Sequence, residues 1–379
     1  MGIFNLRTYL IRSGLKGVRT IHIRELHSKC IALDMSNILY KIKRRLIDTH
    51  STDPTDLQLE LINLIHKFTI NNIRIIGVFD GKPNQTKDKT INARKKIREK
   101  AKKQLEFFDV TFEQDTKYTE LSSTPNESEF SLTDIDSTED NAYAIRTKID
   151  LSKKATRIKF NDVQKCKMLF DLLGIPYIHV KDMEADLVFK YLKDYNIATH
   201  FYTNDTDAIA LGCNMLFDLN YSTDFIKLFD YKQIIEELDL TSELMMELCI
   251  CCGTDFNSGI RNITIDELIT LFQKYGCLNQ IMENGAIPVS NFPRDFNYDN
   301  AFEFFNIEIP VEICTNFTHY EMINPTDTFI KTNFEKIKND ITFVYSNFIS
   351  SLADTKKKVK FSRKLSEFTQ YRYKIKLEF

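Results

Sequence analysis

Acidic side chains stand at the points in this sequence where short apolar runs end. Asp34 follows the run Cys30-Ile31-Ala32-Leu33, and Asp80 follows the run from Ile73 to Phe79. Five more acids occupy comparable places further along the chain: Glu184, Asp186, Asp205, Asp207 and Asp255. If the runs are strands of one parallel sheet, their carboxyl ends converge on one crevice. The sequence therefore predicts a cluster of up to seven carboxylates.

Such a cluster needs cations, because like charges about 4 Å apart repel by roughly 1 kcal/mol in water and by about 4 kcal/mol at an effective dielectric near 20. Oxygen ligands without His or Cys select Mg²⁺, with Mn²⁺ as a substitute. Two such ions about 4 Å apart suit the hydrolysis of a phosphodiester. A single acid such as Asp34 or Asp205 could equally cap a following helix, but seven acids together favour a metal site.

Positive charge for the same reaction is available on the residues that follow Asp80. Lys87 and Arg94 are seven residues apart, which predicts that they share one face of a helix, and Arg98 extends that face. An ammonium and a guanidinium there would clamp a phosphate against the cations. The competing interpretation is a solvated basic helix.

The runs that precede the acids have the length and composition of buried parallel strands, and similar runs lie at 177–180 and 200–203. Apolar residues recur at helical spacing from Leu57 to Phe68, and a helix is also predicted over 184–195. This alternation predicts an α/β fold, with a mainly parallel sheet flanked by helices.

After residue 240 the apolar spacing becomes helical, most clearly over 242–252 and 265–275. This spacing predicts a helical carboxyl-terminal region. By contrast, residues 108–150 are rich in Ser, Thr, Asp and Glu and lack strong periodicity. We therefore expect them to form a flexible acidic insertion.

Charge is distributed in blocks although the net charge is only −2. Residues 82–103 hold ten Lys or Arg and two acids, whereas residues 106–140 hold eleven acids and one Lys. A second basic block over 356–376 has nine Lys or Arg and one acid. Such blocks are often solvated faces or tails, yet two of them keep nucleic acid as a possible partner.

Membrane insertion and secretion are not supported by the sequence. There is no uncharged apolar run of about 18 residues, and Arg7 and Arg12 interrupt the first apolar stretch. The eight cysteines lie in apolar stretches without paired CxxC spacing, so they are predicted to be reduced core residues. We expect an intracellular protein.

The order and spacing of several short motifs resemble those of the flap endonuclease, or XPG-like, family of structure-specific nucleases over roughly residues 1–285. The most specific motif is Val78-Phe79-Asp80-Gly81-Lys82-Pro83, followed by Lys87 and Arg94. The other motifs are Met1-Gly2-Ile3, Ile31-Ala32-Leu33-Asp34-Met35-Ser36, Gly174-Ile175-Pro176-Tyr177, Glu184-Ala185-Asp186, Thr203-Asn204-Asp205-Thr206-Asp207 and Gly253-Thr254-Asp255-Phe256. Within that family, the composition and divergent carboxyl half are most like the poxviral member.

This resemblance implies a PIN-like nuclease core in which the seven acids hold two Mg²⁺ ions and Lys87 and Arg94 engage the scissile phosphate. It also implies that Tyr40 stacks on a base beside the cleavage point, although a plain core tyrosine is the alternative. Gly2 is expected near the site once Met1 is removed. Arg98 and Arg261 are expected to be further DNA contacts.

The implied division is an amino-terminal nuclease region over 1–107, an insertion in the arch region over 108–150, an internal nuclease region over 151–285 and an extension over 286–379. Three departures from the family stand out. Residues 260–266 lack the glycines of the family's DNA-binding helical hairpin, which leaves its grip on duplex in doubt. The acidic insertion partly replaces the arch, and no sliding-clamp box appears near Phe379.

The implied activity is that of a Mg²⁺-dependent endonuclease and 5′-exonuclease acting on branched, flapped, nicked or gapped DNA in replication, recombination and repair. Replication or recombination proteins are the expected partners. The location would be the host cytoplasm for a poxviral protein and the nucleus otherwise.

Two alternatives compete with this function. One is an inactive scaffold that kept the nuclease fold and binds DNA in a replication or recombination complex, but a scaffold should have lost some of the seven carboxylates. The other is an RNA-directed nuclease with the same acidic core, which predicts a shorter chain without the Lys87/Arg94 helix.

Overall fold

The computed structural model describes residues 2–50, 56–81, 87–121, 134–173, 175–179, 183–220 and 222–307. Its centre is a seven-stranded sheet in the order β1-β7-β6-β5-β2-β3-β4. The strands are β1 Val18–His22, β2 Cys30–Asp34, β3 Arg74–Phe79, β4 Tyr177–His179, β5 His200–Tyr202, β6 Met215–Phe217 and β7 Phe225–Phe229. Strands β2 to β6 pair in parallel, whereas β7 is antiparallel to both β1 and β6. The predicted α/β class with a mainly parallel sheet is confirmed.

Strand β2 is the topological centre of the sheet. All five of its residues are buried, as expected for a parallel strand covered on both faces. Strand β3 pairs with one side of it, where Leu33 lies opposite Gly77, and β5 pairs with the other, where Leu33 lies opposite Tyr202. The chain therefore continues to opposite sides of β2, which opens a crevice at its carboxyl end.

The connection between β2 and β3 differs from the single helix predicted from the spacing. It contains two helices, α2 over Met35–Asp48 and α3 over Asp56–Ile70. The predicted cap at Asp53 and Pro54 lies outside the described residues. Helix α2 was missed because it is amphipathic and carries four Lys or Arg after Tyr40, so its apolar positions do not form a prominent run.

Among the remaining helices around the sheet, the one predicted over 184–195 is confirmed as α7. Helices α6 over Phe160–Leu173 and α7 over Ala185–Asp194 precede and follow β4. The other short helices of the sheet region are α1 Leu6–Arg12, the 3-10 helix Ile23–Leu26, α8 Asp207–Ala210 and α9 Tyr231–Glu237.

The predicted helical region after residue 240 is confirmed as far as the structure describes it. It consists of α10 Ser242–Cys252, α11 Ile265–Tyr275, α12 Leu278–Glu283, a 3-10 turn Val289–Asn291 and α13 Tyr298–Asn306. Thr241 caps α10 and Thr264 caps α11, the latter in a capping box with Glu267. Helix α10 packs against α11 and α13. The rest of the 286–379 extension, from residue 308 on, lies outside the described residues.

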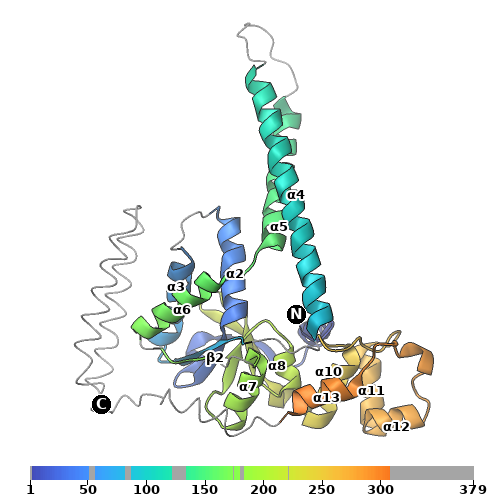
Figure 1. The fold of residues 1–379 in the computed structure, drawn as a ribbon. Coiled ribbons are helices and arrows are strands. Elements are labelled where there is room, and N and C mark those ends of the chain that lie inside the picture. The colour runs from blue at the N-terminus through green and yellow to red at the C-terminus, as the bar shows by residue number, and fades with distance from the viewer. Residues whose placement is uncertain are drawn as a thin grey trace, which may run out of the picture. The chain divides into compact units, whose positions relative to one another are not determined.

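The described residues within 39–57 and 88–159 form a second compact unit. Helix α4 spans Asp88–Leu121 and α5 spans Asp134–Ala155, and the two run side by side (Figure 1). The segment over 108–150, which lacked a strong helical periodicity, is helical at both ends, and its role as a flexible acidic insertion stays a prediction. Local spacing did not reveal these helices, since two helices that pack mainly on one another need only a narrow apolar stripe.

The other unit holds the described residues up to Ile38, those over Gln58–Lys87 and those from Phe160 onward. Six of the eight cysteines predicted to be core residues are buried and free: Cys30, Cys166, Cys213, Cys249, Cys251 and Cys252. Cys277 is half-buried, and Cys314 lies outside the described residues. No helix among the described residues is long and apolar enough to cross a membrane. The predicted division of the chain into functional regions at residues 107 and 150 stays a prediction.

Candidate active site

The carboxyl ends of the three central strands carry the first acids of the site. Asp34 is the last residue of β2, Asp80 follows β3, and Asp205 lies in the loop after β5. Because β3 and β5 pair with opposite sides of β2, these three positions meet at the crevice. The sheet order therefore brings together residues that are up to 171 positions apart in the sequence.

Asp34 both caps a helix and faces the cluster. Its Oδ1 accepts a hydrogen bond from the backbone N–H of Asn37 at 2.9 Å, and its Oδ2 accepts one from the Thr203 hydroxyl at 2.8 Å. Burial, followed by the nearby Asp80 carboxylate, raises the pKa of Asp34 to about 7. Asp34 therefore does both things that the sequence offered as alternatives: it caps the following helix and belongs to the acidic cluster.

Three aspartates form the centre of the cluster. Asp186, Asp205 and Asp207 each place one carboxylate oxygen within 4.8 Å of the others. All three are buried, and Asp207 is completely inaccessible. Burial raises the pKa of Asp186 and Asp207 well above the usual range, and the neighbouring Asp205 carboxylate raises both further. Ionising these three buried carboxylates together is therefore unfavourable, and a bound cation would offset that free-energy cost.

Asp207 provides the test of whether a cation fits. Both of its carboxylate oxygens are buried and have no hydrogen-bond partner among the described residues. Buried polar atoms are normally satisfied, and an orphan carboxylate is especially unfavourable. The candidate ligand atoms around it are carboxylate oxygens, which divalent cations such as Mg²⁺ prefer as ligands. The residues therefore fit a divalent metal ion.

The remaining three predicted acids surround this centre. Glu184 is the N-cap of α7 and is buried. Asp80 is exposed, and its Oδ1 accepts a hydrogen bond from the Ala185 backbone N–H at 3.0 Å, which ties β3 to the start of α7. Asp255, after α10, is half-buried and contributes to the raised pKa of both Asp205 and Asp207. The structure thus gathers all seven acids, whose role as ligands stays a prediction.

Lys87 lies inside this acidic cluster rather than on an exposed helix face. It immediately precedes α4, which begins at Asp88, and a helix face shared with Arg94 stays a prediction. The Lys87 ammonium pairs with the Glu184 carboxylate and is buried. Although burial lowers the pKa of Lys87, the carboxylates of Asp186, Asp207 and Glu184 raise it to a net value above the usual range.

Three other predicted residues lie in the second unit. Arg94 and Arg98 are both half-buried on α4, four residues apart and hence on one face. Tyr40 is half-buried on α2, where the Arg44 guanidinium carbon lies 5.6 Å from its ring centroid. Their predicted contacts with DNA stay predictions.

Gly2 borders the cluster directly. A Cβ built on Gly2 would lie 2.2 Å from Asp205 Oδ1 and 2.6 Å from the Thr206 hydroxyl oxygen. Gly2 also has a φ of +85°, which favours glycine. The proximity that the family resemblance implied for this residue is therefore present.

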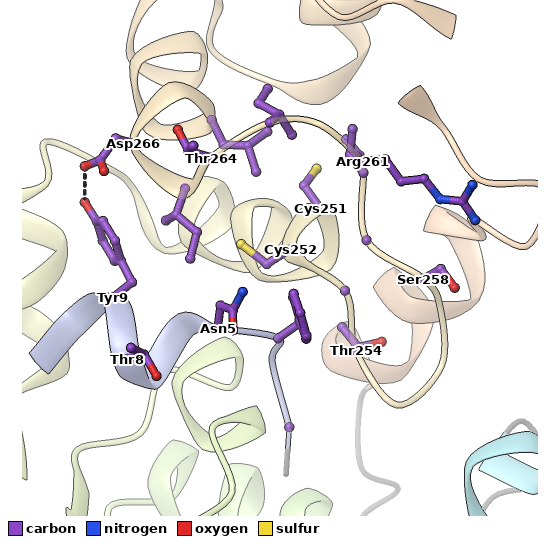
Figure 2. A pocket seen from close by; sticks show the side chains of 18 of the residues that line it. Asn5, Thr8, Tyr9, Cys251, Cys252, Thr254, Ser258, Arg261, Thr264 and Asp266 are labelled. Atoms are coloured by element: carbon purple, nitrogen blue, oxygen red, sulfur yellow. Dashed lines mark hydrogen bonds between the residues drawn. The ribbon is translucent and has the colours of Figure 1, made fainter. Parts of the chain in front are cut away.

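A groove extends from Gly2 and Asp255 along α1 to the start of α11 (Figure 2). It encloses about 1360 Å³. Tyr9 on α1 lines it and donates a hydrogen bond to Asp266 Oδ1 at 2.9 Å. Arg261 lines the same groove with an exposed side chain. The glycine-poor stretch 260–266 is thus one wall of a groove that reaches the acidic cluster.

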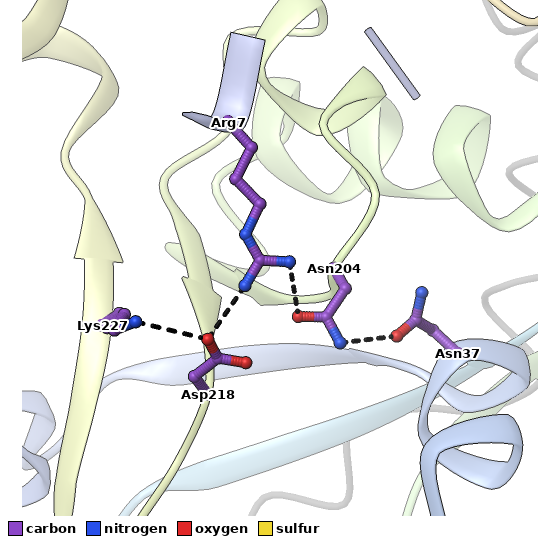
Figure 3. Close-up of polar contacts among 5 residues, drawn as sticks. All are labelled: Arg7, Asn37, Asn204, Asp218 and Lys227. Carbon is purple, nitrogen blue, oxygen red and sulfur yellow. Dashed lines mark hydrogen bonds and ion pairs between the residues drawn. The ribbon is translucent and has the colours of Figure 1, made fainter. Parts of the chain in front are cut away.

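A polar network that the sequence did not reveal connects the loop of Asp205 with the helix that follows Asp34. Arg7 donates to Asp218 Oδ2 at 2.9 Å and to Asn204 Oδ1 at 3.4 Å, and Asn204 donates to Asn37 Oδ1 at 3.1 Å (Figure 3). Asn37 in turn donates its backbone N–H to Asp34. Asn204 belongs to the motif Thr203-Asn204-Asp205-Thr206-Asp207, which could have drawn attention to it. Its hydrogen-bond partners are distant in sequence and were therefore not predicted.

Comparison with known protein families identifies two regions of the chain. Residues 1–101 match the XPG N-terminal domain, and residues 174–255 match the XPG I-region. The seven acids and the Lys87/Arg94 pair all fall within these two regions.

Curated relatives agree with this finding. The probable RAD2-like endonuclease 369L of Invertebrate iridescent virus 6 is 25% identical over 345 residues, covering 81% of this chain and 81% of that protein. Flap endonuclease 1 of Methanosphaera stadtmanae is 26% identical over 275 residues, covering 70% of this chain and 74% of that protein. The first of these relatives accords with the expected likeness to a viral member.

Solved structures share the fold. The catalytic core of Rad2 in complex with DNA substrate has a TM-score of 0.51 and 17% sequence identity, covering 82% of this chain and 81% of that one. Human GEN1 in complex with Holliday junction DNA has a TM-score of 0.50 and 15% identity, covering 81% of this chain and 66% of that one. These similarities confirm the predicted PIN-like fold.

Proposed function

We propose, on the premise that this chain belongs to the XPG family of structure-specific nucleases, that it hydrolyses phosphodiester bonds in branched, flapped, nicked or gapped DNA. Relatives that are named flap endonucleases and RAD2-like endonucleases support the reaction class. The solved structures with DNA substrate and Holliday junction DNA support DNA as the substrate.

One observation carries this proposal most directly: the Asp186, Asp205 and Asp207 cluster, in which both Asp207 oxygens lack a partner among the described residues. We propose that the cluster, with Asp34, Asp80, Glu184 and Asp255, holds two Mg²⁺ ions, for which Mn²⁺ can substitute. When bound, such ions supply Lewis-acid polarisation of the phosphate and lower the pKa of water.

The protein's own groups then bind and orient the scissile phosphate. Lys87, held beside the cluster by Glu184, provides positive charge where negative charge develops in the transition state. Arg94 adds a guanidinium that can bind a phosphate through two parallel hydrogen bonds. Gly2 leaves room beside Asp205 that any side chain would fill.

Further from the reacting phosphate, we propose three contacts with DNA. Tyr40 stacks on a base next to the cleavage point, Arg98 contacts the backbone from α4, and Arg261 contacts it from the groove. The protein works inside the cell on intermediates of replication, recombination and repair, as an endonuclease and 5′-exonuclease.

The decisive experiment incubates the purified full chain with labelled flap, nicked, gapped and RNA substrates, with Mg²⁺, Mn²⁺ or EDTA. We expect Mg²⁺-dependent cleavage of DNA near the junction of single and double strands. Binding of DNA without cleavage under any metal condition would replace this proposal by the inactive scaffold, and preferential cleavage of RNA would replace the substrate.

A further inference from the structure

The Lys87 ammonium has aromatic neighbours in addition to its carboxylate partner. Its Nζ lies 4.8 Å from the ring centroid of Phe256 and 5.3 Å from that of Phe304. The two rings contact each other, with centroids 4.1 Å apart and an angle of 38° between their planes. The ammonium thus pairs with the Glu184 carboxylate and also contacts two aromatic rings.

These rings come from outside the regions that match the family models. Phe256 directly follows Asp255, the last matched residue, and Phe304 lies on α13, nearly fifty residues later. Phe304 is buried at 5% exposure, and α13 packs on α10, the helix that leads to Asp255. Helix α13 therefore reaches the site through a fixed packing contact.

The two rings and the carboxylates affect the Lys87 ammonium in different ways. An ammonium surrounded by several carboxylates is attracted toward all of them, which draws its three N–H donors away from a phosphate. A ring face attracts the cation through its quadrupole but accepts no strong hydrogen bond. It therefore fixes the position of the ammonium while leaving its donors available.

We infer that Phe256 and Phe304 form an aromatic cradle that positions Lys87 for the scissile phosphate, so that α13 is part of the active site. This inference rests on the proposed nuclease function. Phe256 and Phe304 are positioning residues, because they touch Lys87 and not the reacting atoms. The cradle should matter for turnover rather than for affinity, since DNA contacts elsewhere are unaffected.

The test compares Phe304→Leu with the full-length wild-type protein. Leucine keeps apolar volume but removes the π face, so kcat on a cleavable DNA should fall about tenfold while KM stays within about twofold. The matched control is Phe302→Leu, because Phe302 lies on the same helix and stacks on Tyr298 instead. It should leave both constants unchanged.

A second readout does not depend on cleavage. Acylation of lysines by a succinimidyl ester, followed by mass spectrometry without metal, measures how well the Lys87 side chain is held. Its labelling rate, relative to exposed Lys95, should rise at least threefold in Phe304→Leu and stay at the wild-type value in Phe302→Leu. If the wild-type protein cuts no DNA, the proposed function fails while this measurement still tests the cradle.

Fluorinated phenylalanines at position 304 keep the test valid if Phe304→Leu does not fold. Stepwise fluorination withdraws π electron density with little change in shape, so kcat should fall progressively with fluorine number. Unchanged kcat and unchanged Lys87 labelling across Phe304→Leu and the fluorinated series would overturn the inference. A fall in kcat that Phe302→Leu reproduces equally would reduce α13 to a structural support and overturn it as well.

Discussion

Gly2 and Asp205 approach so closely that a Cβ on Gly2 would lie 2.2 Å from Asp205 Oδ1. The same Cβ would lie 2.7 Å from the backbone nitrogen of Thr206, which cannot move without shifting the loop that carries Asp205 and Asp207. The beginning of the chain therefore shares one tightly packed boundary with the acidic cluster.

We predict that Gly2→Ala lowers kcat by at least about tenfold, because the methyl group must displace a proposed metal ligand. The control is Gly14→Ala: Gly14 also has a positive φ, +72°, but no atom lies within 4 Å of its added Cβ. That control carries a backbone strain of about 1–2 kcal/mol without touching the site. Equal cleavage rates of the two variants in a single-turnover assay would refute the explanation.

Asp207→Asn should abolish cleavage and raise the melting temperature in EDTA. It removes one charge from a buried group whose repulsion reaches about 4 kcal/mol per pair at an effective dielectric near 20, and about 1–2 kcal/mol should be recovered after partial protonation is allowed for. Differential scanning fluorimetry should show a rise of a few degrees.

The same experiment with Mg²⁺ tests the metal. Millimolar Mg²⁺ should stabilise the wild-type protein by mass action and stabilise Asp207→Asn much less. The exposed Asp239 supplies the control, as Asp239→Asn should behave like the wild type in both buffers. A wild-type melting temperature that does not respond to Mg²⁺ would count against a metal site.

Lys87→Ala and Arg94→Ala should each lower kcat by on the order of 100-fold with a smaller loss of DNA affinity, because their charge acts mainly in the transition state. Lys95→Ala is the control, since Lys95 neighbours Arg94 but is exposed and lies 3.9 Å from Glu99. Binding measured with Ca²⁺ separates the two effects. Matching losses in binding and turnover would make both residues simple DNA contacts.

Asn204→Ala should raise the Mg²⁺ concentration needed for half-maximal activity roughly tenfold, as loss of a partner that orients metal ligands usually does. It breaks the connection between Asn37 and Arg7 without removing a carboxylate. Asn284→Ala, at an exposed helix end, controls for the loss of an asparagine. A Mg²⁺ titration that superimposes on the wild-type curve would show that the network is dispensable.

His200 should make the protein less stable as the pH falls from about 6.5 to about 4. Burial, followed by the positive charge of Lys29, lowers the pKa of His200 from 6.5 to about 4. Between these pH values His200 is protonated in the unfolded chain but remains neutral in the folded chain. The free energy of unfolding therefore decreases as the pH falls. Allowing for partial exposure, the effect should be about 2 kcal/mol.

Urea unfolding at pH 7 and pH 4.5 measures this contribution. His200→Gln cannot titrate, so it should lose less stability between the two pH values than the wild type loses. His22→Gln provides the comparison, because His22 lies at the end of β1 outside this environment. Identical pH dependence of wild type and His200→Gln would assign the acid sensitivity to other groups.

The sequence alone was sufficient to predict the elements and residues that a local pattern specifies. Strands β2 and β3 and helices α3, α7, α10 and α11 agree with their predicted ranges to within a few residues, because each has an apolar period that its neighbours do not share. The acids were recognisable for the same reason, since the end of a strand is a local boundary. Strands β6 and β7 were missed: Asn214 and Asp218 confine β6 to an apolar run of three residues, and Lys227 interrupts the apolar run of β7.

Tertiary structure decided which of these local features meet. The order β5-β2-β3 places Asp205 beside Asp34 and Asp80, and no local pattern specifies strand order. The contact between Lys87 and Phe304 joins residues more than 200 positions apart, and the clash that only glycine avoids at position 2 involves Asp205. Long-range packing also buried Lys87 among carboxylates, which excludes the competing interpretation of a fully solvated basic helix for this residue. Residue type and local period specify what a segment is, whereas burial and charge at the site depend on neighbours supplied by distant segments.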